Sequence, residues 1–237
     1  MATIEHMNDT DQTPHIGTLN EKSLHAQIKE YLAVEGDQFE VPLKRSVIDI
    51  VRGEQLIEVQ TRNLGAMKGK LKKLLPDHPL HLVHPITAEK WLVRHPQNGH
   101  TSRRKSPKKE NLFHIFSELV YITPYLKSPN LSLEILIIQE EAHQQPGKAQ
   151  TGRWPRKWHT AERQLLTVLE THRFQPAGDI VRLLPPELAE PFTTADLAKA
   201  LKQPRKIAQK MAYTLYHADL IGRDGKRGRA HLYRRLP

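Results

Sequence analysis

The spacing of apolar residues predicts alternating helices and strands along the first 141 residues. Leu24, Ile28 and Leu32 recur at every fourth position, which is the spacing of one helix face. Two β-branched runs on either side of Gly53 indicate a β-hairpin. The predicted elements are a helix at 20–33, strands at 39–43, 46–51 and 56–61, a helix at 63–75, strands at 80–85 and 90–94, a helix at 112–121 and a strand at 131–139. Residues 17–141 are therefore predicted to form an α/β domain with a mixed sheet flanked by helices.

The pattern changes in the second half of the chain. Residues 142–158 are rich in Gln, Gly, Pro and basic side chains and offer few apolar groups to bury, so they are predicted to form a linker. The polar residues 1–16 are predicted to form a disordered tail. Residues 159–237 are predicted to form a second domain, with helices at 160–174, 194–201 and 204–220 and a β-hairpin at 221–236 around Asp224-Gly225.

The turn of the first hairpin fixes which residues face each other across it. Gly53-Glu54 fits a two-residue loop with glycine first, as a type II′ turn prefers. In that register Asp49 lies directly opposite Glu58, with the two side chains on one face and their Cβ atoms about 5 Å apart. A three-residue loop would break this pairing.

Charge is distributed unevenly between the two predicted domains. The formal net charge is +10, and residues 151–237 hold 17 Lys and Arg against 8 Asp and Glu. The first 150 residues hold 19 against 18. A basic domain beside a nearly neutral one indicates a module that binds a polyanion such as DNA, and a basic surface that merely keeps the protein soluble is the alternative.

Composition excludes several classes of protein. The chain has no cysteine, which rules out disulfides and thiolate metal sites and is typical of a cytoplasmic protein. No apolar run approaches the roughly 18–20 residues that a membrane helix needs. The polar N-terminus lacks the apolar centre of a signal peptide, so neither a membrane nor a secreted location is expected.

Asp49 and Glu58 form a candidate metal site. Opposed carboxylates repel each other, an arrangement that sheets normally avoid. A divalent cation would cancel the repulsion, and oxygen ligands at this spacing suit Mg²⁺, with Mn²⁺ as a substitute. Glu21 offers a third carboxylate, because it lies three residues before Leu24 on the sheet-facing stripe. The alternatives are a solvated hairpin face for the pair, and a capping-box role with Thr18 for Glu21.

Glu21, Ile48-Asp49-Ile50 and Ile57-Glu58-Val59-Gln60 resemble the core of the PD-(D/E)xK nucleases, which include restriction endonucleases and archaeal Holliday-junction resolvases. The resemblance covers about residues 17–95. It implies a restriction-endonuclease-like order: a helix with an acidic residue, a hairpin with Asp and Glu-x-Lys, then a helix and further strands. It also implies Mg²⁺-dependent hydrolysis of DNA, in which Asp49, Glu58 and the Val59 carbonyl hold the metal and Glu21 assists.

Gln60 departs from the family pattern, which has a lysine at this position to orient or activate the attacking water. In some members a lysine from the following helix takes over this role. Lys68 is the candidate, because the predicted helix places it between Leu64 and Leu71 on the sheet side. The alternative is that Lys68 only extends past the edge of the core into water. Many nucleases of this fold dimerise, and nothing in the sequence specifies a dimer interface.

The basic region resembles the winged-helix transcription regulators over residues 160–237. Two closely spaced helices form a helix-turn-helix pattern, and the glycine-containing hairpin after them resembles a β-wing. The residues predicted to contact DNA are Arg205, Lys206, Gln209, Lys210, Arg223, Lys226, Arg227 and Arg229. A winged helix used for protein contacts is the alternative.

These observations together predict a Mg²⁺-dependent DNA endonuclease that is targeted by a winged helix. The rival hypothesis is a DNA-binding regulator, or a scaffold in repair or defence, that retains an inert nuclease fold. Gln60 is the residue that keeps this rival open.

Overall fold

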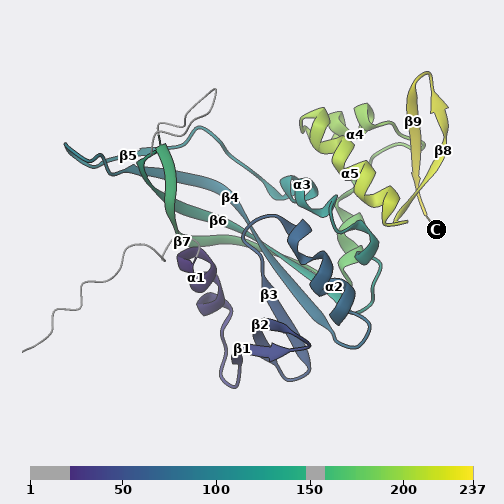
Figure 1. Cartoon of the computed structure of the whole chain (residues 1–237). Coiled ribbons are helices and arrows are strands. Elements are labelled where there is room, and N and C mark those ends of the chain that lie inside the picture. Colours follow the sequence, from purple (N-terminus) through teal and green to yellow (C-terminus); the bar gives the residue numbers. More distant parts are fainter. Residues whose placement is uncertain (1–21, 148–157, 237) are drawn as a thin grey trace, which may run out of the picture.

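The computed structural model describes residues 22–147 and 158–236. The predicted tail at 1–16, Glu21 and the centre of the predicted linker lie outside the described residues. Within them, seven strands form one mixed sheet flanked by helices, which confirms the α/β class (Figure 1). Six of these strands follow the order β1-β2-β3-β4-β6-β7, and β5 pairs with the end of β4.

The first half of the sheet is a three-strand meander followed by a crossover helix. Strands β1, β2 and β3 are antiparallel neighbours, whereas β4 runs parallel to β3 because α2 carries the chain back to the start of the sheet. The elements are α1 (Lys22–Leu32), β1 (Gln38–Leu43), β2 (Ser46–Arg52), β3 (Gln55–Val59), the short 3₁₀ helix η1 (Leu64–Met67), α2 (Lys68–Leu74) and β4 (Leu80–Arg94). The two strands predicted at 80–85 and 90–94 are one long strand with an irregularity between Thr87 and Glu89.

The second half of the sheet is dominated by two long strands. Strand β6 lies parallel to β4. Strand β7 pairs with β6 in the antiparallel direction and forms the edge of the sheet. The elements are β5 (Ser102–Lys105), η2 (Leu112–Ile115), α3 (Phe116–Leu119), η3 (Thr123–Tyr125), β6 (Leu131–Pro146) and β7 (Trp158–Phe174).

Helices cover both faces of the sheet. Successive strand residues point to opposite faces. Leu56 of β3 belongs to the core cluster that includes Leu71 of α2, whereas Ile57 belongs to the cluster of Leu24 and Ile28 in α1. Thus α1 packs on one face, and α2 and α3 pack on the other (Figure 1).

The predicted helix at 160–174 is wrong, and so are the two ends of the predicted linker, at 142–146 and 158, which belong to strands. Residues 142–146 continue β6, and β7 occupies the whole span of the predicted helix. The β6–β7 register shifts three times, and each shift leaves an extra residue on β7: Ala161, Leu166 and Leu169. These bulges interrupt the alternation of a strand, so Leu165, Leu166, Val168 and Leu169 have the spacing of a helix face.

The C-terminal unit, residues 177–236, packs against the α3 side of the sheet. It contains η4 (Ala177–Leu183), α4 (Thr194–Leu201), α5 (Arg205–His217), β8 (Ile221–Arg227) and β9 (Ala230–Arg235). The two predicted helices and the hairpin are therefore confirmed. The hairpin turn lies at Gly228-Arg229 because Arg227 pairs with Ala230, so the predicted turn at Asp224-Gly225 is wrong and that dipeptide forms a bulge.

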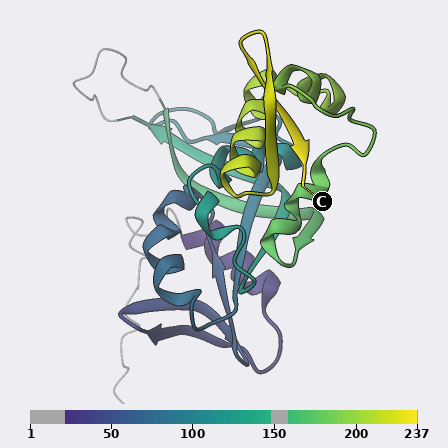
Figure 2. The ribbon, with the colours of Figure 1, turned by 90° about the vertical axis from the view of Figure 1, so that its right-hand side faces the viewer.

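One continuous apolar core joins the C-terminal unit to the sheet. Phe116 of α3, Ile180 of η4 and Met211 of α5 are fully buried in the same cluster. Figure 2, in which the C-terminal unit faces the viewer, shows α5 and the hairpin in front of the sheet. In the described part of the chain, no helix is long and apolar enough to cross a membrane.

Candidate active site

The β2–β3 hairpin has the register that its turn predicts. Arg52 pairs with Gln55 and Ile50 pairs with Ile57, and Gly53 has a φ of 57°. The next hydrogen-bonded pair of an antiparallel ladder would join Ile48 to Val59. The Val59 amide instead donates to Asp49 Oδ2 at 2.8 Å. The carboxylate of Asp49 therefore accepts the hydrogen bond that a backbone carbonyl of β2 would accept if the pairing continued.

Strand β2 changes its orientation at Asp49. Ile48 packs in the α2-side core and Ile50 in the α1-side core, although strict alternation would place both on one face. In the neighbouring β1, Glu40 has a φ of 52° and the Glu40–Asp49 pair is missing from the register. This irregularity directs the Asp49 side chain into the space between the strands.

Asp49 is held in its ionised form. His25 Nε2 of α1 lies 3.2 Å from Asp49 Oδ2, on the same carboxylate oxygen that accepts from Val59. Burial alone would raise the pKa of Asp49, but the hydrogen bonds from His25 and Val59 outweigh burial and lower it.

Glu58 is in the opposite electrostatic situation. Its carboxylate is buried, and Lys70 of α2 donates to Oε1 at 2.6 Å and to the Val47 carbonyl at 2.6 Å. Burial raises the pKa of Glu58 to about 7, against the lowering effect of Lys70, and the charge of Asp49 adds to the increase. The two carboxylates therefore lie close enough to repel each other. The single positive charge of Lys70 does not offset the combined effect of burial and of Asp49 on the Glu58 carboxylate.

Asp49 and Glu58 form the carboxylate pair, and the lysine that contacts Glu58 of this pair is Lys70 and not the predicted Lys68. Lys68 is exposed, and its ammonium group lies over the ring of Tyr121 at 6.0 Å. Lys68 was expected to face the sheet because residues 63–75 were predicted to form one regular α-helix. Residues 64–67 instead form a 3₁₀ helix, which has fewer residues per turn. This rotation turns position 70 toward the sheet.

Gln60 lies at the end of β3, beside a polar cleft. Its side chain donates to the Asn63 carbonyl at 3.4 Å, and its own carbonyl accepts from His84 Nδ1 at 2.6 Å. His84 lines a cleft of about 390 Å³ that also contains Glu118 and Arg163. Burial lowers the pKa of His84, so its ring is neutral at pH 7.

The carboxylate pair offers the oxygen ligands that Mg²⁺ prefers, and it supplies two side chains to such a site. Among the described residues, no group of three or more His, Asp and Glu side chains is arranged to hold a metal. Glu21, the third predicted ligand, lies outside those residues. His25 and Lys70 are the site residues that the sequence analysis missed. His25 follows Glu21 by four positions, so the helical stripe that selected Glu21 contained the signal for His25.

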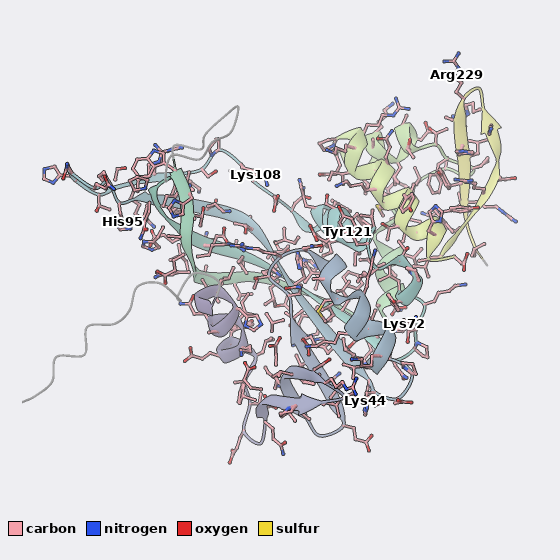
Figure 3. The ribbon with its side chains drawn as sticks, viewed as in Figure 1. Lys44, Lys72, His95, Lys108, Tyr121 and Arg229 are labelled. Atoms are coloured by element: carbon pink, nitrogen blue, oxygen red, sulfur yellow. The ribbon has the colours of Figure 1, made fainter. Side chains whose placement is uncertain are left out.

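The residues predicted to bind DNA line α5 and the β8–β9 hairpin. All but the half-buried Lys210 are exposed, and Figure 3 shows Arg229 at the hairpin tip. Arg227 is bound by Asp196 at 3.2 Å, and the Arg223 guanidinium lies 4.1 Å from the centre of the Tyr216 ring. The C-terminal unit holds 12 Lys and Arg against 6 Asp and Glu, so it retains most of the excess charge.

Comparison with known proteins identifies relatives of the chain. Residues 22–175 match the family model described as "Domain of unknown function (DUF8091)". The chain is 31% identical over 230 residues to an "Uncharacterized protein" of Treponema pallidum (strain Nichols), which covers 94% of this chain and 88% of that protein. No solved structure matches. The family match ends directly after β7, so β7 belongs with the sheet, while the relative also spans the C-terminal unit.

Proposed function

We propose that this chain, which belongs to the DUF8091 family, is a metal-dependent DNA endonuclease of the PD-(D/E)xK type with a winged-helix module. The observation that carries the proposal is the 2.6 Å contact between Lys70 and Glu58. Lys70 supplies the positive charge that the family's lysine would provide and that Gln60 does not. It does so next to Asp49 and Glu58, directly after the last paired residues of β2 and β3.

The order of elements supports this proposal. The chain runs α1–β1–β2–β3–α2–β4, with the Asp on the second strand, the Glu on the third and β4 parallel to β3. This is the order of helix, hairpin, helix and strand that the resemblance to PD-(D/E)xK nucleases implies. The two helices and hairpin after residue 193 likewise agree with the order expected of a winged helix.

The site residues have complementary roles in this chemistry. Asp49 and Glu58, with the Val59 carbonyl and Glu21, would hold the Mg²⁺, which activates water and neutralises phosphate charge when bound. Lys70 is placed to stabilise the charge that develops on the phosphate, because its ammonium group already lies beside Glu58. His25 positions Asp49 through its hydrogen bond.

One observation favours the rival, a DNA-binding protein with an inert nuclease fold. Each carboxylate of the pair already has a protein partner, and no more than 9% of either residue is exposed. The same contacts of His25 with Asp49 and of Lys70 with Glu58 would be expected in a site that has no catalytic activity. Cleavage must therefore be measured directly.

The test is incubation of the purified protein with plasmid, branched and single-stranded DNA, in Mg²⁺, in Mn²⁺ and in EDTA. Metal-dependent cleavage is expected, and Lys70→Met should reduce its rate by about 100-fold, the size of effect typical for loss of one charge-stabilising donor. Lys72→Met is the matched control, because Lys72 is an exposed lysine of the same helix. No cleavage of any substrate with either metal would contradict the catalytic role, and DNA binding without cleavage would support the rival.

A further inference from the structure

Aromatic and basic side chains line a cleft between α5 and the β8–β9 hairpin. This α5–hairpin cleft has a volume of about 340 Å³, and Arg205, Gln209, Tyr213, Arg223 and Arg229 contribute to its walls. Four of these were predicted to touch DNA as isolated cationic or polar groups. The structure joins them to a set of rings that the sequence analysis did not consider.

The helix wall of the cleft is one row of side chains. Arg205, Gln209, Tyr213 and His217 follow each other at intervals of four residues, so they project from one side of α5. Tyr213 is 49% exposed, and its ring centre lies 4.2 Å from that of His217. Such exposure of a large ring is not explained by core packing, since Met211 and Leu215 of the same helix are fully buried.

The hairpin wall adds positive charge beside more rings. The Arg223 guanidinium lies 4.1 Å from the centre of the Tyr216 ring, and Tyr233 and His231 continue the row of rings on β9. Partial burial lowers the pKa of His231, and the charges of Arg223 and Lys226 lower it further. The arginines that line the cleft therefore supply positive charge that does not depend on His231.

Exposed rings between cationic groups suit one class of ligand especially well. Aromatic side chains and guanidinium planes stack with nucleobases that are not paired, while cations hold the neighbouring phosphates. Bases inside a duplex are already stacked on each other and present only their edges in the grooves. A ring such as Tyr213 therefore gains a stacking partner only from unpaired DNA.

We propose that the α5–hairpin cleft binds an unpaired base of single-stranded DNA, with Tyr213 as the stacking platform and Arg205 and Arg229 on the flanking phosphates. This inference rests on the proposed function only in taking DNA as the ligand. It adds a preference for substrates in which double-stranded DNA meets a single strand.

The test compares three fluorescently labelled DNAs at one salt concentration: a blunt duplex, the same duplex with a six-nucleotide overhang, and oligo-dT. The overhang and oligo-dT should bind more tightly than the blunt duplex. Tyr213→Ala should weaken oligo-dT binding about tenfold, which corresponds to the loss of one stacked base, and Tyr213→Phe should retain the affinity. Binding to the blunt duplex should change less than about twofold with either variant, because paired bases cannot stack on the ring.

Two further arms make the outcome decisive. An oligonucleotide with 2-aminopurine should lose fluorescence on binding to the wild type and not to Tyr213→Ala, whereas Tyr31→Ala, which removes an equally exposed tyrosine on α1, should behave as the wild type.

If Tyr213→Ala binds oligo-dT as the wild type does, the cleft does not stack bases. Preference for polyglutamate over DNA would assign the cleft to an acidic protein. Absence of binding to all three DNAs would overturn the proposed function as well, and binding without cleavage would overturn only its catalytic part.

Discussion

Glu58 and Glu140 are both buried carboxylates of the same sheet, yet their surroundings differ. Glu140 is fully buried between two cations, Lys90 at 2.6 Å and Arg163 at 2.9 Å. Burial raises the pKa of Glu140, but Arg163 and Lys90 outweigh it and the pKa is lowered. Glu58 has one cation, Lys70, and a like charge, Asp49, nearby, so its pKa rises to about 7.

This difference separates a structural carboxylate from a candidate functional one. At Glu140 the protein itself offsets the cost of burying a charge, so nothing further is needed. At Glu58 the cost is only partly offset, and the remaining negative charge of the carboxylate pair favours a bound cation. The contrast gives the metal-site proposal a physical basis that does not depend on any resemblance.

Glu140→Gln should give the largest loss of stability, because it removes the buried negative charge that lies between Lys90 and Arg163. Removing one member of a buried ion pair costs about 3–5 kcal/mol. Urea denaturation at pH 7 measures this as a lower midpoint with an unchanged slope. Glu170→Gln, which changes an exposed glutamate of β7, is the control. A loss for Glu58→Gln as large as that for Glu140→Gln would contradict the comparison.

Glu58 should make stability fall as pH rises. Its folded-state pKa of about 7 lies above the ordinary value of 4.5, so the folded protein holds this proton longer than the unfolded chain does. The contribution is fully present below pH 4.5 and lost as pH rises through 7, a decrease of about 3 kcal/mol. The measurement is the free energy of unfolding of the wild type minus that of Glu58→Gln, from pH 4.5 to 8. A difference that stays flat over this range would show that Glu58 is not short of positive charge.

Local rules were sufficient for part of this site. The turn at Gly53-Glu54 determined the β2–β3 register, because a two-residue loop allows only one pairing of its flanking residues. The two helices after residue 193 were also predictable from their apolar spacing, whereas the hairpin that follows them was predicted with its turn at the wrong glycine, Gly225 instead of Gly228. The turn also predicted that Asp49 pairs directly with Glu58, but the observed pairing ends at Ile50 and Ile57, and Asp49 accepts from the Val59 amide instead.

The partners of the carboxylates depend on structure that local rules do not contain. Lys70 reaches Glu58 because a 3₁₀ turn precedes α2 and changes the helix phase. The edge strand β7 resembled a helix because its bulges break the alternation, and with it Arg163, the partner of Glu140, was assigned to the wrong kind of element. Whether each glutamate is compensated therefore depends on contacts between elements distant in sequence.

Mg²⁺ should stabilise the protein through the carboxylate pair. A ligand that binds only the folded state adds about 1.4 kcal/mol when its concentration is ten times its dissociation constant. The gain should appear in urea denaturation with Mg²⁺ against EDTA at pH 7.5, where Glu58 is largely ionised. It should be absent in Asp49→Asn and in Glu58→Gln, and retained in Glu170→Gln. A gain that survives in both carboxylate variants would place the cation elsewhere.

DNA affinity should depend far less on these carboxylates than on the C-terminal unit, and salt dependence distinguishes the two. Each phosphate contact contributes a slope of about −0.9 to the logarithm of the binding constant against the logarithm of salt concentration. The double variant Arg205→Ala/Lys206→Ala removes two exposed cations of α5 and should make the slope shallower by up to about 0.9 per contact. Glu58→Gln should leave the slope unchanged and raise the affinity by no more than about twofold, because only one partly compensated charge disappears. Lys44→Ala/Lys72→Ala, which removes two cations on the sheet side (Figure 3), is the matched control. If that control changes the slope as much as the α5 variant does, DNA binds along the sheet, and the carboxylate pair then contributes to affinity as well as to chemistry.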